Sequence, residues 1–266
     1  MNDFFLAPLL SLFSLKFYRR VILKSVSFGF SYLGYLSAIF ALSSLVMFAA
    51  ISIPVADELA KWFASNLPEM TFTRQGVQMG INQPVLLSHP RWGPILYLDP
   101  ANDSPQPQDM NQALLVIART QVAYQNPSGG GYRLQKITPP PNQKEWHDLR
   151  INNGILNMFW TRVRPFLYPL SFVVAFLAAF FWKLAAGLFY SLIGLILNRF
   201  RNQKLNYGAI LNLSILALTP VALLQIAGFT TPLHVPTNFG VTLVVTTLYL
   251  TLGILGTRDR KAPKPL

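Results

Sequence analysis

Polar side chains inside apolar stretches are the first candidates for chemistry in this chain. Lys183, Asn212 and Gln225 each lie within a long apolar run. Such groups are costly in hydrocarbon, so they either mark an ion or substrate pathway or form hydrogen bonds between closely packed helices. Small residues at four-residue spacing would allow that close packing and favour the structural interpretation: Gly34 with Ala38, and Gly187 with Ser191.

The other reactive residue types match no catalytic or metal-binding pattern. The histidines lack metal-site spacing and are interpreted as surface or turn residues: His89, His147 and His234. Asp99, Asp103 and Asp109 could suggest calcium, but their loop lacks the central glycine and the density of oxygen ligands that a calcium loop needs, so they are interpreted as solvated turn residues. The absence of cysteine removes thiol catalysis. The sequence therefore predicts neither an enzyme nor a bound metal or cofactor.

Four long apolar stretches must position the intramembrane candidates. They cover residues 28–53, 165–197, 208–229 and 239–257. Each is long enough to cross a hydrocarbon core of about 30 Å at about 1.5 Å per residue. The composition agrees, with 52% hydrophobic and 12% charged residues. We expect a membrane protein with an α-helical bundle of four transmembrane helices.

Lysine and arginine clusters set the expected orientation of these spans. The clusters fall in residues 1–27, 198–207 and 258–266, and positive loops stay in the cytoplasm. Both termini should therefore lie in the cytoplasm, and residues 54–164 should lie outside the cytoplasm. The net charge of +12 gathers at the ends of the spans, which favours membrane orientation over nucleic-acid binding.

Residues 165–197 are longer than one span requires, since they would make a helix of about 50 Å. One interpretation is a tilted helix that continues past the inner interface, with Lys183 snorkelling to the headgroups. A second splits the segment near Lys183 and makes Leu184–Asn198 interfacial or re-entrant. A third, a fifth span, would move the basic loop at 198–207 outside.

The segment between the first two spans changes its side-chain period. Residues 54–67 have helical spacing, short runs of period two follow between Glu69 and Ile137, and residues 146–163 again indicate a helix. This pattern predicts an inserted extracytoplasmic α+β domain, which has no disulfides because the chain has no cysteine. Residues 1–27 suggest a helix at the cytoplasmic interface, and Pro220 should kink the third span.

Short motifs along most of the chain resemble the bacterial membrane proteins grouped as domain of unknown function 1189. They are Phe17-Tyr18-Arg19, Gly29-Phe30-Ser31-Tyr32-Leu33, Phe72-Thr73-Arg74-Gln75-Gly76, Gln83-Pro84, Leu98-Asp99, Tyr207-Gly208 and Ala217-Leu218-Thr219-Pro220. Pro100 departs from the threonine expected after Asp99. The resemblance carries over no catalytic residue and implies at most an envelope or transport context in the bacterial inner membrane.

Together these observations predict a non-enzymatic, multi-pass inner-membrane protein. It would act as a scaffold, sensor or accessory subunit, with the bilayer and a protein partner in the cell envelope as its contacts. The first alternative is a small permease or an accessory subunit of a transporter, with Lys183, Asn212 and Gln225 lining a polar path. The second is a membrane-embedded enzyme. The residues do not indicate an oligomeric state.

Overall fold

A computed structural model describes residues 2–106, 109, 113–126, 131–137, 148–201, 203–230 and 238–256. The structure is mostly helical, with two small sheets. It divides into two compact units. The helical unit comprises Met1–Ser52 and Phe166–Leu266, and the sheet unit comprises Ile53–Pro165. Each unit is described on its own.

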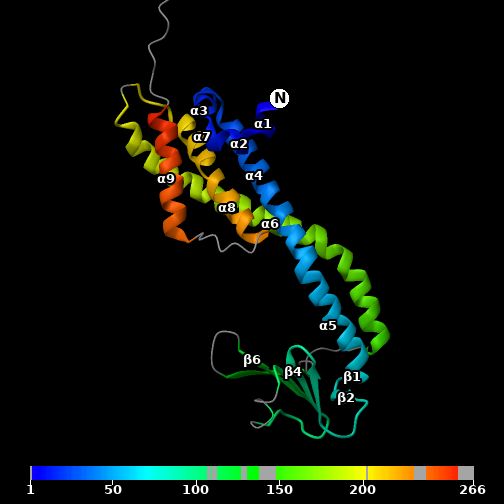
Figure 1. Cartoon of the computed structure of the whole chain (residues 1–266). Coiled ribbons are helices and arrows are strands. Elements are labelled where there is room, and N and C mark those ends of the chain that lie inside the picture. The colour runs from blue at the N-terminus through cyan, green and yellow to red at the C-terminus, as the bar shows by residue number, and fades with distance from the viewer. Residues whose placement is uncertain are drawn as a thin grey trace, which may run out of the picture. The chain divides into compact units, whose positions relative to one another are not determined.

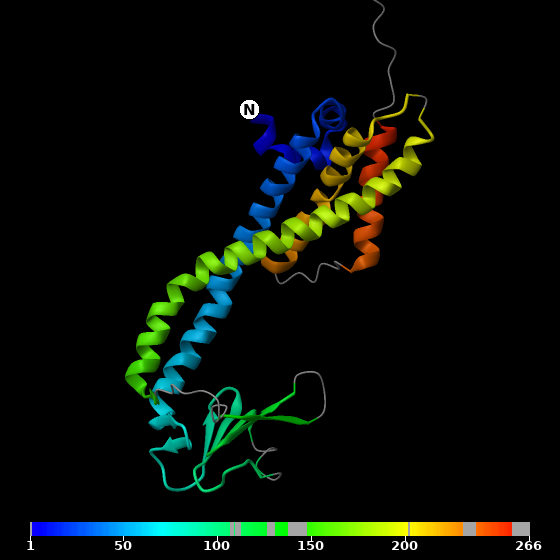
Figure 2. The ribbon, with the colours of Figure 1, turned by 180° about the vertical axis from the view of Figure 1, so that it is seen from behind.

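The helical unit begins with three short helices, α1 (Asn2–Phe5), α2 (Ala7–Phe13) and α3 (Leu15–Ile22). Helices α2 and α3 pack against the later helices α7 (Tyr207–Ala217), α8 (Thr219–Thr230) and α9 (Phe239–Leu255), as Figures 1 and 2 show for α3 and α7. Phe17, Tyr18 and Val21 on α3 are buried there. The predicted interfacial segment is therefore part of the folded core of this unit.

Helix α7 forms the centre of the helical unit. All of its residues from Ala209 to Ala217 are buried, and α4 (Val26–Met47) packs along both α7 and α8. The break between α7 and α8 comes at Leu218, two residues before Pro220. The predicted kink is confirmed, because proline lacks the N–H that would continue the helix.

Helix α6 (Asn153–Asn198) is continuous through Lys183, so the second of the three interpretations, which split the segment near this residue, is wrong. Its buried residues in the helical unit recur every three or four positions: Ala179, Lys183, Gly187, Tyr190, Ser191, Gly194 and Asn198. A Cβ atom at Gly194 would lie 2.6 Å from Ile210 Cγ2, and one at Gly187 would lie 3.2 Å from Ile215 Cγ1. The predicted close packing at Gly187 and Ser191 is confirmed, whereas a Cβ atom at Gly34 would meet nothing within 4 Å.

In the part of the chain that the structure describes, three helices are long and apolar enough to cross a membrane: Val26–Asn66, Asn153–Asn198 and Tyr207–Gly228. The first of these ranges includes α4, a π-helical turn η1 (Phe48–Ser52) and α5 (Ile53–Asn66). Pro54 explains the wider turn, since its ring displaces the carbonyl of the residue four positions earlier. Helix α9 is a shorter apolar helix. These helices fit a membrane protein.

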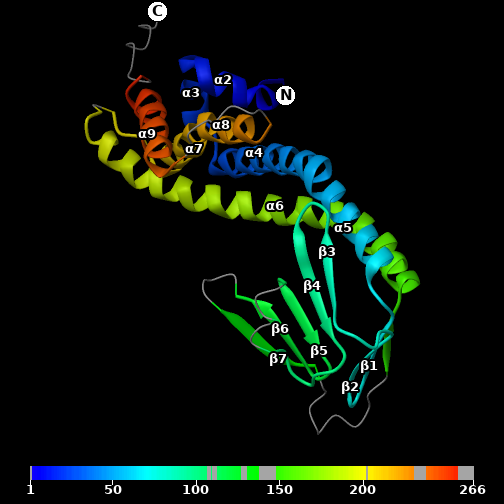
Figure 3. The same cartoon turned by 60° about the horizontal axis from the view of Figure 1, so that its bottom comes forward.

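The sheet unit contains a five-stranded sheet in the order β3-β4-β5-β6-β7 and a three-stranded sheet in the order β2-β1-β8, both visible in Figure 3. The strands are β1 (Met70–Thr73), β2 (Gly76–Met79), β3 (Val85–His89), β4 (Gly93–Asp99), β5 (Leu115–Ala118), β6 (Gln121–Gln125), β7 (Tyr132–Lys136) and β8 (Leu149–Ile151). All pairs are antiparallel except β4 with β5. Phe63 and Leu67 pack against the core of this unit.

The predicted period changes are confirmed by α5 and by strands β1 to β6. The second helix is a partial error, because residues 149–151 form strand β8 against β1 and α6 begins only at Asn153. Asn152 marks the change, since its Oδ1 accepts a hydrogen bond of 2.9 Å from Ile155 N. The earlier part of that prediction, residues 146 and 147, lies outside the described residues.

Candidate functional site

The sheet unit contains a polar cleft of about 490 Å³ between the β1–β2 hairpin and the loop that follows β4. This volume lies within the range of about 300–1,000 Å³ that is common for ligand sites. Its lining is formed by Thr73, Gln75, Gly76, Val77, Gln78, Met79, Ile81, Asn82, Pro100, Ala101 and Arg119. Amides, a guanidinium and backbone groups therefore face one concave surface, without a carboxylate among them.

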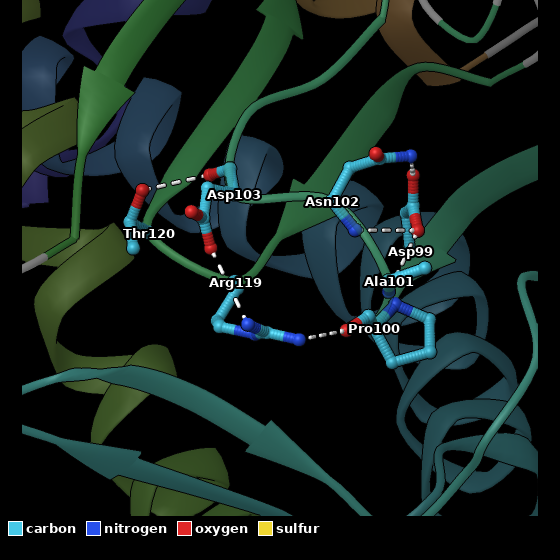
Figure 4. Close-up of polar contacts among 7 residues, drawn as sticks. All are labelled: Asp99, Pro100, Ala101, Asn102, Asp103, Arg119 and Thr120. Atoms are coloured by element: carbon cyan, nitrogen blue, oxygen red, sulfur yellow. Dashed lines mark hydrogen bonds and ion pairs between the residues drawn. The ribbon is translucent and has the colours of Figure 1, made fainter.

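The loop after β4 is held by the carboxylate of Asp99, which is 1% exposed (Figure 4). Its Oδ1 accepts hydrogen bonds from Ala101 N at 2.9 Å and Asn102 N at 3.2 Å, and its Oδ2 accepts one from Asn102 Nδ2 at 2.7 Å. These donors lie two and three residues after the aspartate, so Pro100 can lack an N–H without loss. The departure at Pro100 is thus compatible with the turn.

Arg119 and Thr120 fix the same loop from its other side (Figure 4). Arg119 N donates to Asn102 O and Thr120 N donates to Asp103 O, each at 3.0 Å. The Arg119 guanidinium donates to Pro100 O at 3.0 Å and lies 3.6 Å from Asp103 Oδ1. One wall of the cleft is therefore set by side-chain and backbone contacts rather than by strand pairing.

Replacing Asp99 with alanine is expected to loosen this wall. The Ala101 and Asn102 amides would lose a charged acceptor, and we expect a loss of about 1 kcal/mol because both amides can then bond to water. Faster amide exchange should be confined to residues 101–103. Asp99→Asn keeps one acceptor oxygen and serves as the control. Equal exchange in the alanine variant and the native protein would contradict this assignment.

The other wall is the β1–β2 hairpin, whose end approaches Arg119 closely. Gly76 has a φ of +129°, and a Cβ atom there would lie 2.3 Å from the Arg119 carbonyl oxygen. Val77 N donates to the same oxygen at 2.6 Å. Sequence reasoning missed this site, because Gly76 and Arg119 are far apart in the chain. The only local signal is the glycine that ends a two-residue turn.

His89 is not the surface or turn residue that was predicted, since it is 4% exposed. Its ring stacks on Trp92 at 4.2 Å and meets Trp62 of α5 edge to face at 5.2 Å between ring centroids. Its Nδ1 accepts a hydrogen bond from Arg91 N at 3.1 Å, and its Nε2 lies 3.8 Å from Glu58 Oε1. The histidine thus packs the end of β3 against α5.

Within the described residues, no group of three or more His, Cys, Asp or Glu side chains is placed to hold a metal ion. The aspartates that were considered for calcium and interpreted as solvated turn residues have separate partners, and Asp99 and Asp109 are buried rather than solvated. Asp103 contacts Arg119, and Asp109 Oδ2 accepts a hydrogen bond from Gln106 N at 3.2 Å. His147 and His234 lie outside the described residues.

Two charged contacts connect the segments that enclose the sheet unit. Asp57 Oδ1 accepts a hydrogen bond from Trp160 Nε1 at 2.8 Å, and Asp57 Oδ2 forms an ion pair with Arg164 Nη2 at 3.0 Å. These two contacts join α5 to the first part of α6. Glu69, just before β1, accepts a hydrogen bond from Arg150 Nε of β8. This hydrogen bond lowers the pKa of Glu69 from its ordinary value of 4.5.

The Glu69 contact predicts a pH-dependent contribution to the attachment of β8. Because the folded pKa is lowered, the stabilisation is present above the unfolded pKa and is lost as the pH falls through the folded value. The difference in unfolding free energy between the native protein and Glu69→Gln should shrink from about pH 6 to about pH 3. Urea unfolding at each pH would measure it. A constant difference would contradict the prediction.

The three intramembrane candidates are not gathered in one place in the helical unit. Lys183 is 6% exposed, and its Nζ donates to Gln225 Oε1 at 3.2 Å and lies 4.8 Å from the centre of the Phe40 ring. Asn212 is separate, since its Nδ2 donates to the carbonyls of Lys24 at 3.2 Å and Ser25 at 3.1 Å. The structure thus pairs Lys183 with Gln225, which differs from the snorkelling interpretation.

Comparison with known proteins gives one family. The family model described as "Protein of unknown function (DUF1189)" matches residues 7–254, which include the whole sheet unit and most of the helical unit. No curated protein and no solved structure matches the chain.

Proposed function

The chain belongs to the DUF1189 family of unknown function, and we propose that it is a four-span protein of the bacterial inner membrane that binds an envelope partner through its sheet unit. The spans would be residues 28–53, 165–197, 208–229 and 239–257, within or close to α4, α6, α7–α8 and α9. Helix α9 has 17 residues, at the lower end of spanning length. The proposal makes the sheet unit an inserted extracytoplasmic α+β domain with both termini in the cytoplasm.

The orientation is supported by basic residues at the proposed cytoplasmic ends of helices. Arg19 Nη2 donates to Gly256 O at 3.3 Å, and Arg201, which is 7% exposed, donates to Ile254 O. Both contacts place positive charge at the carboxyl end of α9, where the helix dipole is negative. These side chains thus serve packing as well as orientation.

Topology can be tested with a reporter that is active only outside the cytoplasm. Fusion after Asn126 should give a signal, because this residue lies between β6 and β7 of the sheet unit. Fusion after Gln203 or after Leu266 should give none. A signal at Gln203 would contradict the four-span arrangement.

The observation that carries the binding role is the cleft between the β1–β2 hairpin and the loop after β4. Its two walls are joined by the Val77 N to Arg119 O hydrogen bond of 2.6 Å, so its shape is set before a partner arrives. Preorganised polar groups on a concave surface favour the binding of a partner over a purely structural role. The sheet unit would then act as scaffold, sensor or accessory subunit without chemistry of its own.

Filling the cleft tests this role. Ala101 is exposed and lines the cleft, so Ala101→Trp should block it while leaving its own N–H on Asp99. Gln135→Trp, on the exposed strand β7, is the matched control. Proteins that co-purify with the full chain from its own membrane should be lost with the first variant and kept with the second. Identical sets from both variants would overturn the proposed role of the cleft.

A second candidate function, a small permease or transporter accessory, is supported by Lys183. Burying an ammonium group inside a helical unit costs free energy. A buried lysine is therefore expected to contribute either to helix packing or to a polar path. Asn212 does not share that location, because it bonds to the carbonyls of Lys24 and Ser25. Only two of the three candidate residues would therefore line such a path.

A further inference from the structure

The edge of β2 that faces the cleft carries backbone groups with no strand beside them. Gly80 N donates to Glu69 O toward β1, whereas Val77 N donates to Arg119 O, away from β1. Backbone groups alternate in direction along a strand, so the N–H and C=O of Met79 point away from β1 as well. In the sheet order β2-β1-β8, β2 is a terminal strand. Val77 N–H is already bonded to Arg119 O, so the groups that remain open onto the cleft lined by Val77, Met79 and Ile81 are the N–H and C=O of Met79 and the C=O of Val77.

The other strand edges of the sheet unit carry features that discourage pairing. Strand β3 has a register shift between Leu87 and Ser88, β7 carries Arg133 and Lys136, and β8 carries Arg150. Bulges and charged side chains are common ways of protecting a sheet edge. Strand β2, with the sequence GVQM and a regular register against β1, has neither. Within the described strands, the unprotected edge is thus the one recessed in a cleft.

Charge indicates the chemistry of the occupant. Arg119 is the charged residue of the cleft lining, and its side chain is 50% exposed. Its contacts with Pro100 O and Asp103 use two of the five N–H donors of a guanidinium. The remaining donors suit a carboxylate, which guanidinium groups bind well.

We propose that β2 binds an extended peptide segment of the envelope partner as an added strand, with an acidic group of that segment at Arg119. This mode of recognition is β-augmentation, in which backbone hydrogen bonds supply affinity and side-chain contacts supply selectivity. It rests on the proposed function of the cleft and names the class of its ligand. Strand β2 has four residues, so the bound segment would be about four to six residues long.

The test uses the full chain in lipid nanodiscs and a library of synthetic hexapeptides, half of which contain one Asp or Glu. Acidic members should bind at least about tenfold more tightly than their amide counterparts, and Arg119→Gln should remove that preference. The best peptide is then N-methylated at one position at a time. Binding should fall about tenfold at alternate positions and change little at those between them, because only every second N–H faces β2.

Met79→Pro provides the matching change in the protein. Its N–H points away from β1, so proline removes an outward donor without breaking the β1–β2 ladder, as at other sheet edges. Peptide binding should fall about tenfold in this variant and stay unchanged in Met79→Leu. Unchanged unfolding of Met79→Pro would confirm that it folds, and Ala101→Trp gives a second block of the cleft if it does not.

Some results would overturn the inference. They are the absence of any bound peptide, uniform sensitivity to N-methylation, or peptide binding that survives both Met79→Pro and Ala101→Trp. Binding of a second copy of this chain at the β2 edge, in place of a peptide, would also overturn it. If Ala101→Trp releases a partner from the native membrane while no peptide binds, this inference fails and the proposed function stands. If peptides bind but Ala101→Trp releases no partner, the proposed function fails instead.

Discussion

Gly76→Ala is expected to destabilise the sheet unit by about 3 kcal/mol, the largest effect that we predict for a single substitution. Two causes act at once. The φ of +129° at Gly76 is strained for any residue with a Cβ atom. That atom would also lie 2.3 Å from the carbonyl oxygen of Arg119, which already accepts the hydrogen bond from Val77 N. The contact is with backbone, so no side-chain rotation can relieve it.

Gly93→Ala separates the two causes. Gly93 has a φ of +71°, but a Cβ atom there would meet nothing within 4 Å, so only the conformational cost of about 1 kcal/mol should appear. Hydrogen exchange of the full chain, measured over β4 to β6, would report the stability of the sheet unit in both variants. If Gly76→Ala lowers the stability of the sheet unit no more than Gly93→Ala does, the contact between residue 76 and the Arg119 carbonyl oxygen is not tight.

Local patterns in the sequence predicted much of the sheet unit. The alternation at Met70–Thr73 and at Gln121–Gln125, and the helical spacing before Asn66, each depend on neighbours within a few residues. Helix α7 and its break before Pro220 could be predicted for the same reason. Long apolar runs also predicted the helices that fit a membrane protein.

Contacts between distant segments could not be predicted in this way. The parallel pairing of β4 with β5, the recruitment of Leu149–Ile151 as β8 and the burial of His89 all depend on which segments meet. The cleft is such a case, since it joins Gly76 to Arg119. Asp99 was noted only as a turn residue, although the geometry of its carboxylate determines one wall of the cleft.

Lys183 shows the same limit inside the helical unit. A lysine in an apolar helix is compatible with snorkelling to the headgroups or with a partner in the protein, and the sequence near position 183 does not distinguish them. The distinction depends on Gln225, which is on α8, and on the face that α6 turns toward it. Gly187 and Ser191 share the buried stripe of α6 with Lys183, which is why its side chain is enclosed.

Gln225→Leu is expected to destabilise the helical unit by about 2 kcal/mol, because it removes the amide oxygen that accepts from Lys183 Nζ and leaves the ammonium enclosed. The ring of Phe40, 4.8 Å from Nζ, would offset part of that loss. Lys183→Met should change stability by less than about 1 kcal/mol, since a similar apolar chain replaces the charge. The two losses of stability differ because Gln225→Leu leaves a buried charge without its partner, whereas Lys183→Met removes the charge.

The double variant decides between pairing and snorkelling. If Lys183 and Gln225 interact, Lys183→Met should restore most of the stability lost in Gln225→Leu, with a coupling of about 1–2 kcal/mol. Thermal unfolding of the purified chain in detergent would measure all three variants. Additive losses would show that the ammonium does not depend on Gln225, as expected for a lysine that reaches the headgroups. Coupling would show that the pair contributes to helix packing, as expected for an enclosed ammonium bonded to an amide of a neighbouring helix.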